Sequence, residues 1–320
     1  MGALNVANIL QLTANGIAAG SAYALLGVAF GLILGVSGRF HVALTVSYTL
    51  AAFVAAWLGA TPGPGLPFWL ALGCGAAAAA LAGIAMERFV YLPLSLTGAR
   101  VGTNIFLMIF VASLGLSIAG RNALALSALQ TPSLLISGFN NVGNNVGPVT
   151  ITSLNIALVV TSWAAILILA VVLEKTALGR MIRAVRANPE MSLCVGINPR
   201  AIYLAVFAIG SFLAGIAAVF QATSTSATPD MGLIPLFYAL VVAFVAGLSA
   251  PPLAVALTGL VIGLVESYSS LFLPTQWTTL VVFVILFVYV ALRPLVEGGY
   301  FKRRARRPAP AVTHAQAEGS

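Results

Sequence analysis

The chain has 320 residues, of which 60% are hydrophobic and only 7% are charged, with 15 Lys and Arg against 7 Asp and Glu. A soluble globular domain carries about 25% charged residues, so this composition excludes a water-soluble fold and requires a bilayer as solvent. The apolar residues run in unbroken blocks of roughly 20, the length of a spanning helix, which also excludes a barrel of alternating strands.

Nine apolar blocks follow one another, and they predict an all-α fold, a polytopic transmembrane helical bundle with eight or nine membrane segments. The blocks are residues 16–36, 42–60, 66–86, 101–119, 151–173, 201–222, 233–248, 253–273 and 277–292. We expect one transmembrane domain over residues 1–300. In the first block, Gly16, Gly20 and Ala24 have the small-residue spacing that lets helices approach closely, and we interpret it as general helix packing.

The junction between the first two blocks, residues 37–41, contains Arg39 and His41. It is either a tight turn at the inner face or a broken helix buried in the protein, which a bilayer permits only where protein or a cavity surrounds the backbone. If the second block re-enters instead of spanning, the number of crossings falls and the N-terminus changes sides.

The connections between blocks predict the orientation. Lys and Arg concentrate in residues 87–100 and 174–200 and in the tail, and the positive-inside rule places these segments in the cytoplasm. The other connections carry almost no basic residues and are expected outside: they are residues 61–65, 120–150, 223–232 and 274–276. Nine crossings then put the N-terminus outside and the C-terminus inside. Residues 122–150, rich in Asn and Gly without charge, predict an external loop.

Residues 301–320 form a basic tail that we expect to be disordered and cytoplasmic. Its basic residues are Lys302, Arg303, Arg304, Arg306 and Arg307. Such a run fits the positive-inside rule and contact with membrane lipid headgroups better than a nucleic-acid partner.

The segment 174–200 carries the most specific pattern. Residues 178–186 predict a short helix with apolar residues on one side and Arg180, Arg183 and Arg186 on the other. Asn188 can cap a second short helix, with Pro189 in its first position and Glu190 at its positive end, and Gly196 suits a C-terminal stop. Two short helices would form a compact knob on the cytoplasmic face.

This segment resembles a known family. The run from Leu178 to Asn198, with its Leu-Gly-Arg, Arg-Ala-Val-Arg-Ala-Asn-Pro-Glu and Val-Gly-Ile-Asn elements, is similar to the coupling loop of permeases in branched-chain amino-acid ABC importers. Residues 14–25 resemble the opening of the first span in that family, and residues 87–94 resemble its second cytoplasmic signature. The three matches occur in order and cover most of the chain.

The resemblance implies a multi-pass permease subunit in the bacterial inner membrane. The coupling loop would sit in a groove of an ABC ATPase subunit, with a second permease and an external substrate-binding protein completing the importer. The residues it assigns to ATPase coupling are Gly179, Arg180, Arg183, Arg186, Asn188, Pro189, Glu190 and Gly196. Whether the two permeases are identical or different is left open.

The sequence departs from the family at two places. The family hinge reads Asn-Phe-Ala-His-Gly-Glu, whereas residues 41–46 here read His-Val-Ala-Leu-Thr-Val. The later glycine-rich turn is reduced to residues 247–252, Gly-Leu-Ser-Ala-Pro-Pro. The resemblance implies branched-chain or other small amino acids as the substrate, and these departures leave urea or short amides as the alternative.

Few polar residues qualify for a substrate path. Glu266 is the one clear charge within an apolar block, where an ionised group costs about 2.5–3.5 kcal/mol. Its carboxylate either faces a cavity or pairs two helices. Alternatively, it lies near the outer boundary of the membrane, where it snorkels to the surface or satisfies a polar group of the bundle. Tyr23, His41, Ser47 and Tyr48 are the other candidates to line a polar path.

The sequence predicts neither enzyme activity nor a cofactor. It contains no phosphate-binding loop of the Gly-x-x-x-x-Gly-Lys-Ser/Thr type, so a partner must hydrolyse ATP. Two isolated cysteines, Cys74 and Cys194, have no metal-ligand spacing. An ATPase-independent secondary transporter or channel, and a non-transporting scaffold, are the alternatives from other classes.

Overall fold

The computed structural model describes residues 6–59, 64–101, 104–126, 143–146 and 149–304. Six of its helices are long and apolar enough to cross a membrane, and three shorter apolar helices accompany them. The prediction of an all-α, polytopic membrane protein is confirmed, while the number of crossings stays a prediction.

The elements follow the predicted blocks. The long spans are α1 (Val6–Ser37), the continuous helix of α3 (Phe68–Met86), η1 (Glu87–Tyr91) and α4 (Leu92–Val101), α5 (Ile105–Leu126), α6 (Ser153–Lys175), α9 (Pro199–Ser224) and α11 (Pro252–Ser269). The shorter apolar helices are α2 (Leu44–Gly59), α10 (Leu233–Ala246) and part of α12 (Thr275–Arg304). Helices α7 (Ala177–Ala187) and α8 (Pro189–Cys194) connect α6 to α9, and β1 (Gly143–Val146) pairs antiparallel with β2 (Val149–Thr152).

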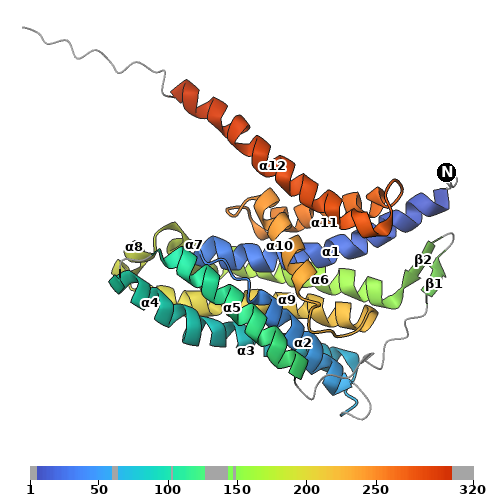
Figure 1. Ribbon diagram of the computed structural model, residues 1–320, viewed down its shortest axis with the longest axis horizontal. Coiled ribbons are helices and arrows are strands. Elements are labelled where there is room, and N and C mark those ends of the chain that lie inside the picture. The colour runs from blue at the N-terminus through green and yellow to red at the C-terminus, as the bar shows by residue number, and fades with distance from the viewer. Residues whose placement is uncertain (1–5, 60–63, 102–103, 127–142, 147–148, 305–320) are drawn as a thin grey trace, which may run out of the picture.

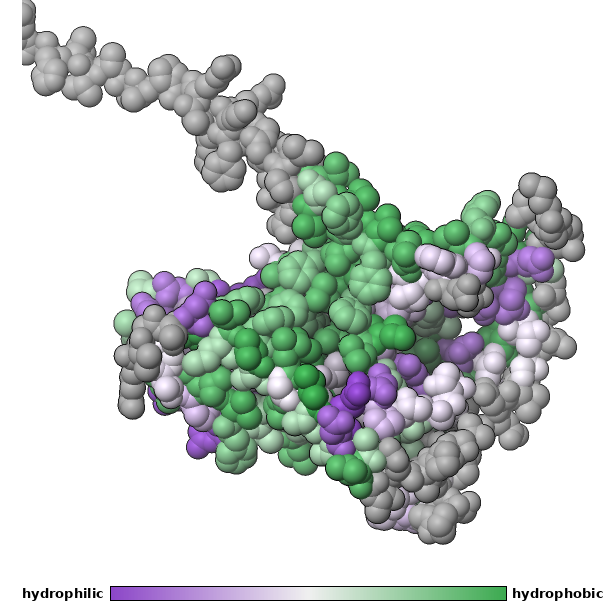
Figure 2. Space-filling model, viewed as in Figure 1, coloured by the Kyte–Doolittle hydropathy of each residue, from purple (hydrophilic) through white to green (hydrophobic). Residues whose placement is uncertain are grey.

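The helices run between two ends (Figure 1). Helices α4, α7 and α8 lie at one end, which we call the knob end, and β1, β2 and the start of α1 lie at the other, the hairpin end. Helix α12 leans away from the bundle and continues through residues 301–304, the first part of the predicted tail; residues 305–320 lie outside the described residues. Figure 2 shows hydrophobic residues over much of this face, with hydrophilic ones at the knob end, at the hairpin end and in a patch in the lower middle of the view.

Two packing features organise the core. Helix α2 buries 11 of its 16 residues and packs against α3, α5, α9 and α10. Helix α1 crosses α11 at glycines: a Cβ added to Gly263 would lie 2.3 Å from Gly20 Cα. Gly16 faces Leu264 of α11 in the same way, so these small residues serve helix packing within the chain.

The junction between α1 and α2 is a break in the helix that is buried in the protein. Gly38 ends α1 with a φ of +65° and donates its N–H to Leu34 O at 2.9 Å, the left-handed cap that favours glycine. Arg39, His41 and Ala43 are all buried, and Ser113 Oγ of α5 accepts the Ala43 N–H at 2.9 Å. Of the two arrangements considered for this junction, the structure has the broken, protein-enclosed backbone.

The prediction that residues 87–100 form a loop is wrong, while their placement in the cytoplasm stays a prediction. The chain instead stays helical from Phe68, because residues 87–91 form one π-helical turn in which Leu92 N–H reaches Glu87 O. Pro93 follows directly, and a proline ring clashes with the carbonyl four residues earlier in a regular α-helix. The wider turn relieves that clash, so the apolar helix does not end at Met86.

Candidate functional site: a central cavity, a buried polar network and the knob

A cavity of about 610 Å³ lies between α1, α2, α6, α9 and α10. Residues 225–232 connect α9 to α10, and several of them border the cavity. Its polar lining residues are Tyr23, Tyr48, Asn155, Gln221, Ser224, Thr225, Ser226, Thr228, Asp230 and Tyr238. Alanine, leucine, phenylalanine, isoleucine and methionine side chains supply most of the remaining wall. A mostly apolar cavity with a few polar groups is the usual form of a small-molecule site.

Aromatic residues fix one wall of the cavity. The rings of Tyr23 and Tyr238 stack with centroids 4.1 Å apart and planes inclined by 12°. The Tyr238 hydroxyl donates to Glu266 and lies 3.3 Å from Thr279 Oγ1. Across the cavity, the Tyr48 hydroxyl donates to Gln221 Oε1. These bonds hold the rings in place, because each hydroxyl is committed to a partner on another helix.

The charges around the cavity are few. Asp230 forms an ion pair with Arg121 at 2.7 Å, and both side chains are about half exposed. No Lys or Arg lines the cavity wall. Within the part of the chain that the structure describes, no group of three His, Cys, Asp or Glu residues has the arrangement of a metal site. Among the described residues that line the cavity, Asp230 is thus the charged one, and its ion-pair partner Arg121 lies outside the lining.

The predicted path residues separate into two groups. Tyr23 and Tyr48 line the cavity, and Glu266 stands directly behind it, bonded to Tyr238. Ser47 is buried with its hydroxyl 3.9 Å from Met86 Sδ, and His41 lies in the helix break, so neither borders the cavity. Their roles in transport stay predictions.

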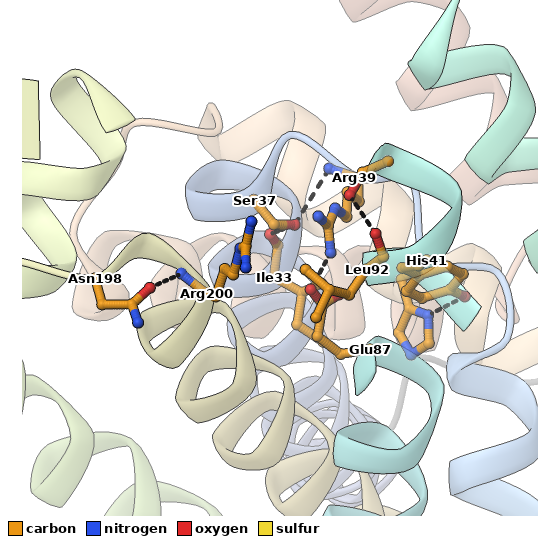
Figure 3. A network of polar contacts seen from close by, with 10 residues as sticks. Ile33, Ser37, Arg39, His41, Glu87, Leu92, Asn198 and Arg200 are labelled. Atoms are coloured by element: carbon orange, nitrogen blue, oxygen red, sulfur yellow. Dashed lines mark hydrogen bonds and ion pairs between the residues drawn. The ribbon is translucent and has the colours of Figure 1, made fainter. Parts of the chain in front are cut away.

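An ion pair that sequence reasoning missed joins the α1–α2 helix break to the π-turn η1. Arg39 and Glu87 form a salt bridge, with side chains only 9% and 1% exposed. In Figure 3 the two side chains point toward each other, and the beginning of α9 lies beside them. The Arg39 guanidinium also sits 5.0 Å from the ring centre of Tyr203 in α9. The available signal was an acid directly following an unbroken apolar block, but it was interpreted as the start of a loop.

His41 extends this network toward the centre of the bundle. Its Nδ1 lies 2.8 Å from the Tyr91 hydroxyl, and its ring lies 4.9 Å from that of Phe207. The hinge side chains thus bind π-turn residues of the third span and pack against α9.

The knob has the two short helices that the sequence predicts, and both are capped. Thr176 Oγ1 accepts the Gly179 N–H at 3.3 Å at the start of α7. Asn188 Oδ1 accepts the N–H groups of Glu190 and Met191, both at 3.0 Å, and Pro189 opens α8. Gly196 has a φ of +82°, which ends this segment as expected for a glycine.

The arginines on the basic side of α7 are less free to bind a partner than the sequence predicts. Arg180 is exposed, but Arg183 donates to Leu173 O and Arg186 donates to Leu248 O, so two of the three guanidinium groups bind carbonyls of the same chain. Helix α8 exposes Glu190, and α8 together with the residue after it also exposes three large apolar side chains. These are Met191, Leu193 and Val195, at 66%, 60% and 72% exposure.

Comparisons with known proteins identify a family of similar sequence. Residues 12–291 match the family model described as branched-chain amino acid transport system / permease component. The chain is 27% identical over 297 residues to the high-affinity branched-chain amino acid transport system permease protein BraD of Pseudomonas aeruginosa, covering 89% of this chain and 94% of that protein. It is 26% identical over 301 residues to the corresponding LivH of Escherichia coli, with the same coverage.

Over a shorter stretch, the chain is also similar to a sugar import permease. The fructose import permease protein FruF of Bifidobacterium longum is 42% identical over 59 residues, which is 18% of this chain and 17% of that protein. No solved structure matches the chain.

Proposed function

From the premise that the chain belongs to the family of branched-chain amino acid transport permeases, we propose that it forms the membrane path of an ATP-driven importer. The observation that carries this proposal is the knob, two capped helices with exposed apolar side chains between α6 and α9. A secondary transporter or channel has no need of such a docking element. Because the sequence lacks a phosphate-binding loop, the energy for transport comes from separate ABC ATPase subunits.

The proposed docking face is the exposed tip of the knob at α8 and the residue after it, where Met191, Leu193 and Val195 are the large apolar side chains. Apolar side chains that protrude from a cytoplasmic knob gain free energy when a partner's groove covers them. Gly179, Arg180, Asn188, Pro189 and Glu190 shape the knob around this face. ATP-driven closure of the ATPases would displace the knob, and the helices joined to it would follow.

The cavity is the substrate site in this proposal. Branched-chain or other small amino acids suit its apolar walls and neutral polar groups, with Tyr23 and Tyr48 in the lining and Glu266 holding Tyr238 in place. The hairpin end would face outward and receive substrate from an external binding protein, and a second permease would complete the membrane part. Nine crossings of the bacterial inner membrane put the knob in the cytoplasm.

The test is purification of the tagged chain from its native membrane in mild detergent. We compare wild type with a Met191→Glu/Leu193→Glu variant, which puts two charges on the proposed docking face. Thr97→Glu, an exposed residue of α4 at the same end, is the matched control. We expect ATPase subunits to co-purify with wild type and with the control, and to be lost from the double variant.

Other outcomes separate the alternatives. If no ATPase accompanies even the wild type, an ATPase-independent transporter or a scaffold becomes the better explanation. If the double variant retains its ATPase, the docking face lies elsewhere on the knob. In reconstituted vesicles, ATPase activity stimulated by a loaded binding protein is expected for the importer and not for a scaffold.

A further inference from the structure

One guanidinium group of the knob binds a distant part of the same chain instead of pointing toward a partner protein. Arg186, in the last turn of α7, donates to the carbonyl of Leu248, which lies 62 residues further along the chain. Leu248 belongs to residues 247–251, the turn between α10 and α11. By contrast, Arg183 binds Leu173 O, within the α6–α7 unit that the chain already joins.

The turn that Arg186 holds is stiff. Gly247 has a φ of +90° and donates its N–H to Ala243 O at 3.1 Å and Phe244 O at 3.2 Å, which fixes the turn to the end of α10. Ala250 N–H closes the turn on Gly247 O at 2.9 Å. Pro251 and Pro252 then restrict φ at the start of α11. A displacement of Leu248 therefore moves α10 instead of being absorbed in the loop.

Helix α10 leads from this turn to the cavity. Its 14 residues extend roughly 20 Å. Its opposite end supplies Ile234 and Pro235 to the cavity wall, and Tyr238 follows near the middle of the helix. Tyr238 is fixed there by its stack on Tyr23 and its bond to Glu266. One short, continuous helix thus connects the carbonyl that Arg186 binds to the aromatic wall of the proposed substrate site.

We propose that Arg186 is a positioning residue that transmits displacement of the knob through Leu248 and α10 to the Tyr23–Tyr238 wall of the cavity. This inference rests on the proposed function, because only an ATPase displaces the knob. The competing route is the covalent one through α6, whose far end also borders the cavity at Leu154 and Asn155. The two routes predict different results when the Arg186 contact alone is removed.

The first test is Arg186→Gln in the complete complex reconstituted in vesicles. We measure ATPase subunits bound, ATP hydrolysed and substrate taken up. We expect the ATPase to stay bound while uptake per ATP falls about fivefold or more, the lower end of measured coupling between sites. Arg88→Gln, an exposed arginine of η1 outside the knob, is the control and should match wild type.

A second variant interrupts the same contact from α1. A Cβ at Gly35 would lie 2.7 Å from Leu248 O and 3.6 Å from Arg186 Nη2, so Gly35→Ala pushes the turn away from α7. Gly31→Ala, one turn earlier, meets only Ala243 Cβ at an ordinary 3.5 Å. We expect Gly35→Ala to lower uptake per ATP as Arg186→Gln does, and Gly31→Ala to leave it unchanged.

Failure of this inference can be distinguished from failure of the proposed function. If wild type itself binds no ATPase, the proposed function fails. If wild type is coupled but Arg186→Gln keeps its uptake per ATP, the route through α10 is overturned in favour of α6. If Arg186→Gln loses the ATPase, Arg186 belongs to the docking surface and the inference is again overturned. If Gly35→Ala does not fold, Arg186→Gln decides.

Discussion

At the scale of single residues, the Arg39–Glu87 ion pair affects stability because both of its charges are buried. Removing two charges from water costs several kcal/mol for each ion, and mutual attraction offsets that cost only with a close partner. The pair joins the hinge between α1 and α2 to the π-turn of the third span, and Arg39 adds a contact with Tyr203 of α9. Loss of either charge leaves the other buried and unpaired.

We expect Glu87→Gln to destabilise the protein by about 3–5 kcal/mol, because Arg39 keeps its charge without a partner. Replacing both residues by methionine should recover most of that loss. Thermal unfolding in detergent measures both effects.

The exposed pair Arg121–Asp230 is the matched control for this prediction. Solvent screens these two side chains, so Arg121→Gln should cost no more than about 1 kcal/mol. An equal cost at the two ion pairs would contradict the importance of burial.

At the scale of elements, the crossing of α1 and α11 depends on glycine at the contact. A side chain at Gly263 would meet the Gly20 backbone at 2.3 Å, so the two helices would have to separate. We expect Gly263→Ala to cost about 1–3 kcal/mol, as overpacking does, measured by thermal unfolding in detergent.

Gly115 of α5 provides the comparison for that substitution. A Cβ there meets nothing within 4 Å, and alanine favours a helix more than glycine. Gly115→Ala should therefore leave stability unchanged or raise it slightly. If both alanine variants behaved alike, the close approach of α1 and α11 would not limit stability.

At the scale of the whole molecule, the orientation can be tested with a native residue. Cys194 is exposed on α8 at the knob end. In a Cys74→Ser background, we expect a membrane-impermeant maleimide to label Cys194 in inside-out vesicles and not in intact cells. Labelling in intact cells would place the knob outside and reverse the topology.

Thr228 serves as the opposite marker, because it is exposed and borders the cavity beside the α9–α10 connection. A Thr228→Cys variant lacking both native cysteines should react in intact cells. Added substrate with its binding protein should slow that reaction if the cavity is the substrate site.

The sequence supported much of this fold because its signals are local. Apolar blocks, caps and helical periodicity depend on neighbouring residues, so the helices and the Asn188-capped knob were predictable. The π-turn at 87–91 was missed because a charged residue after an apolar block has the same pattern as a loop. Of the candidate site, Tyr23 and Tyr48 border the cavity, whereas His41 and Ser47 do not.

The sequence by itself determined that the chain is a helical membrane protein with a two-helix knob, since hydropathy and capping act over a few residues. Only the tertiary structure decided that Arg39 meets Glu87, that Tyr238 stacks on Tyr23, and that Arg186 binds Leu248. Each of these contacts joins residues that are distant in the chain. The packing of helices, which no local pattern specifies, brings them together.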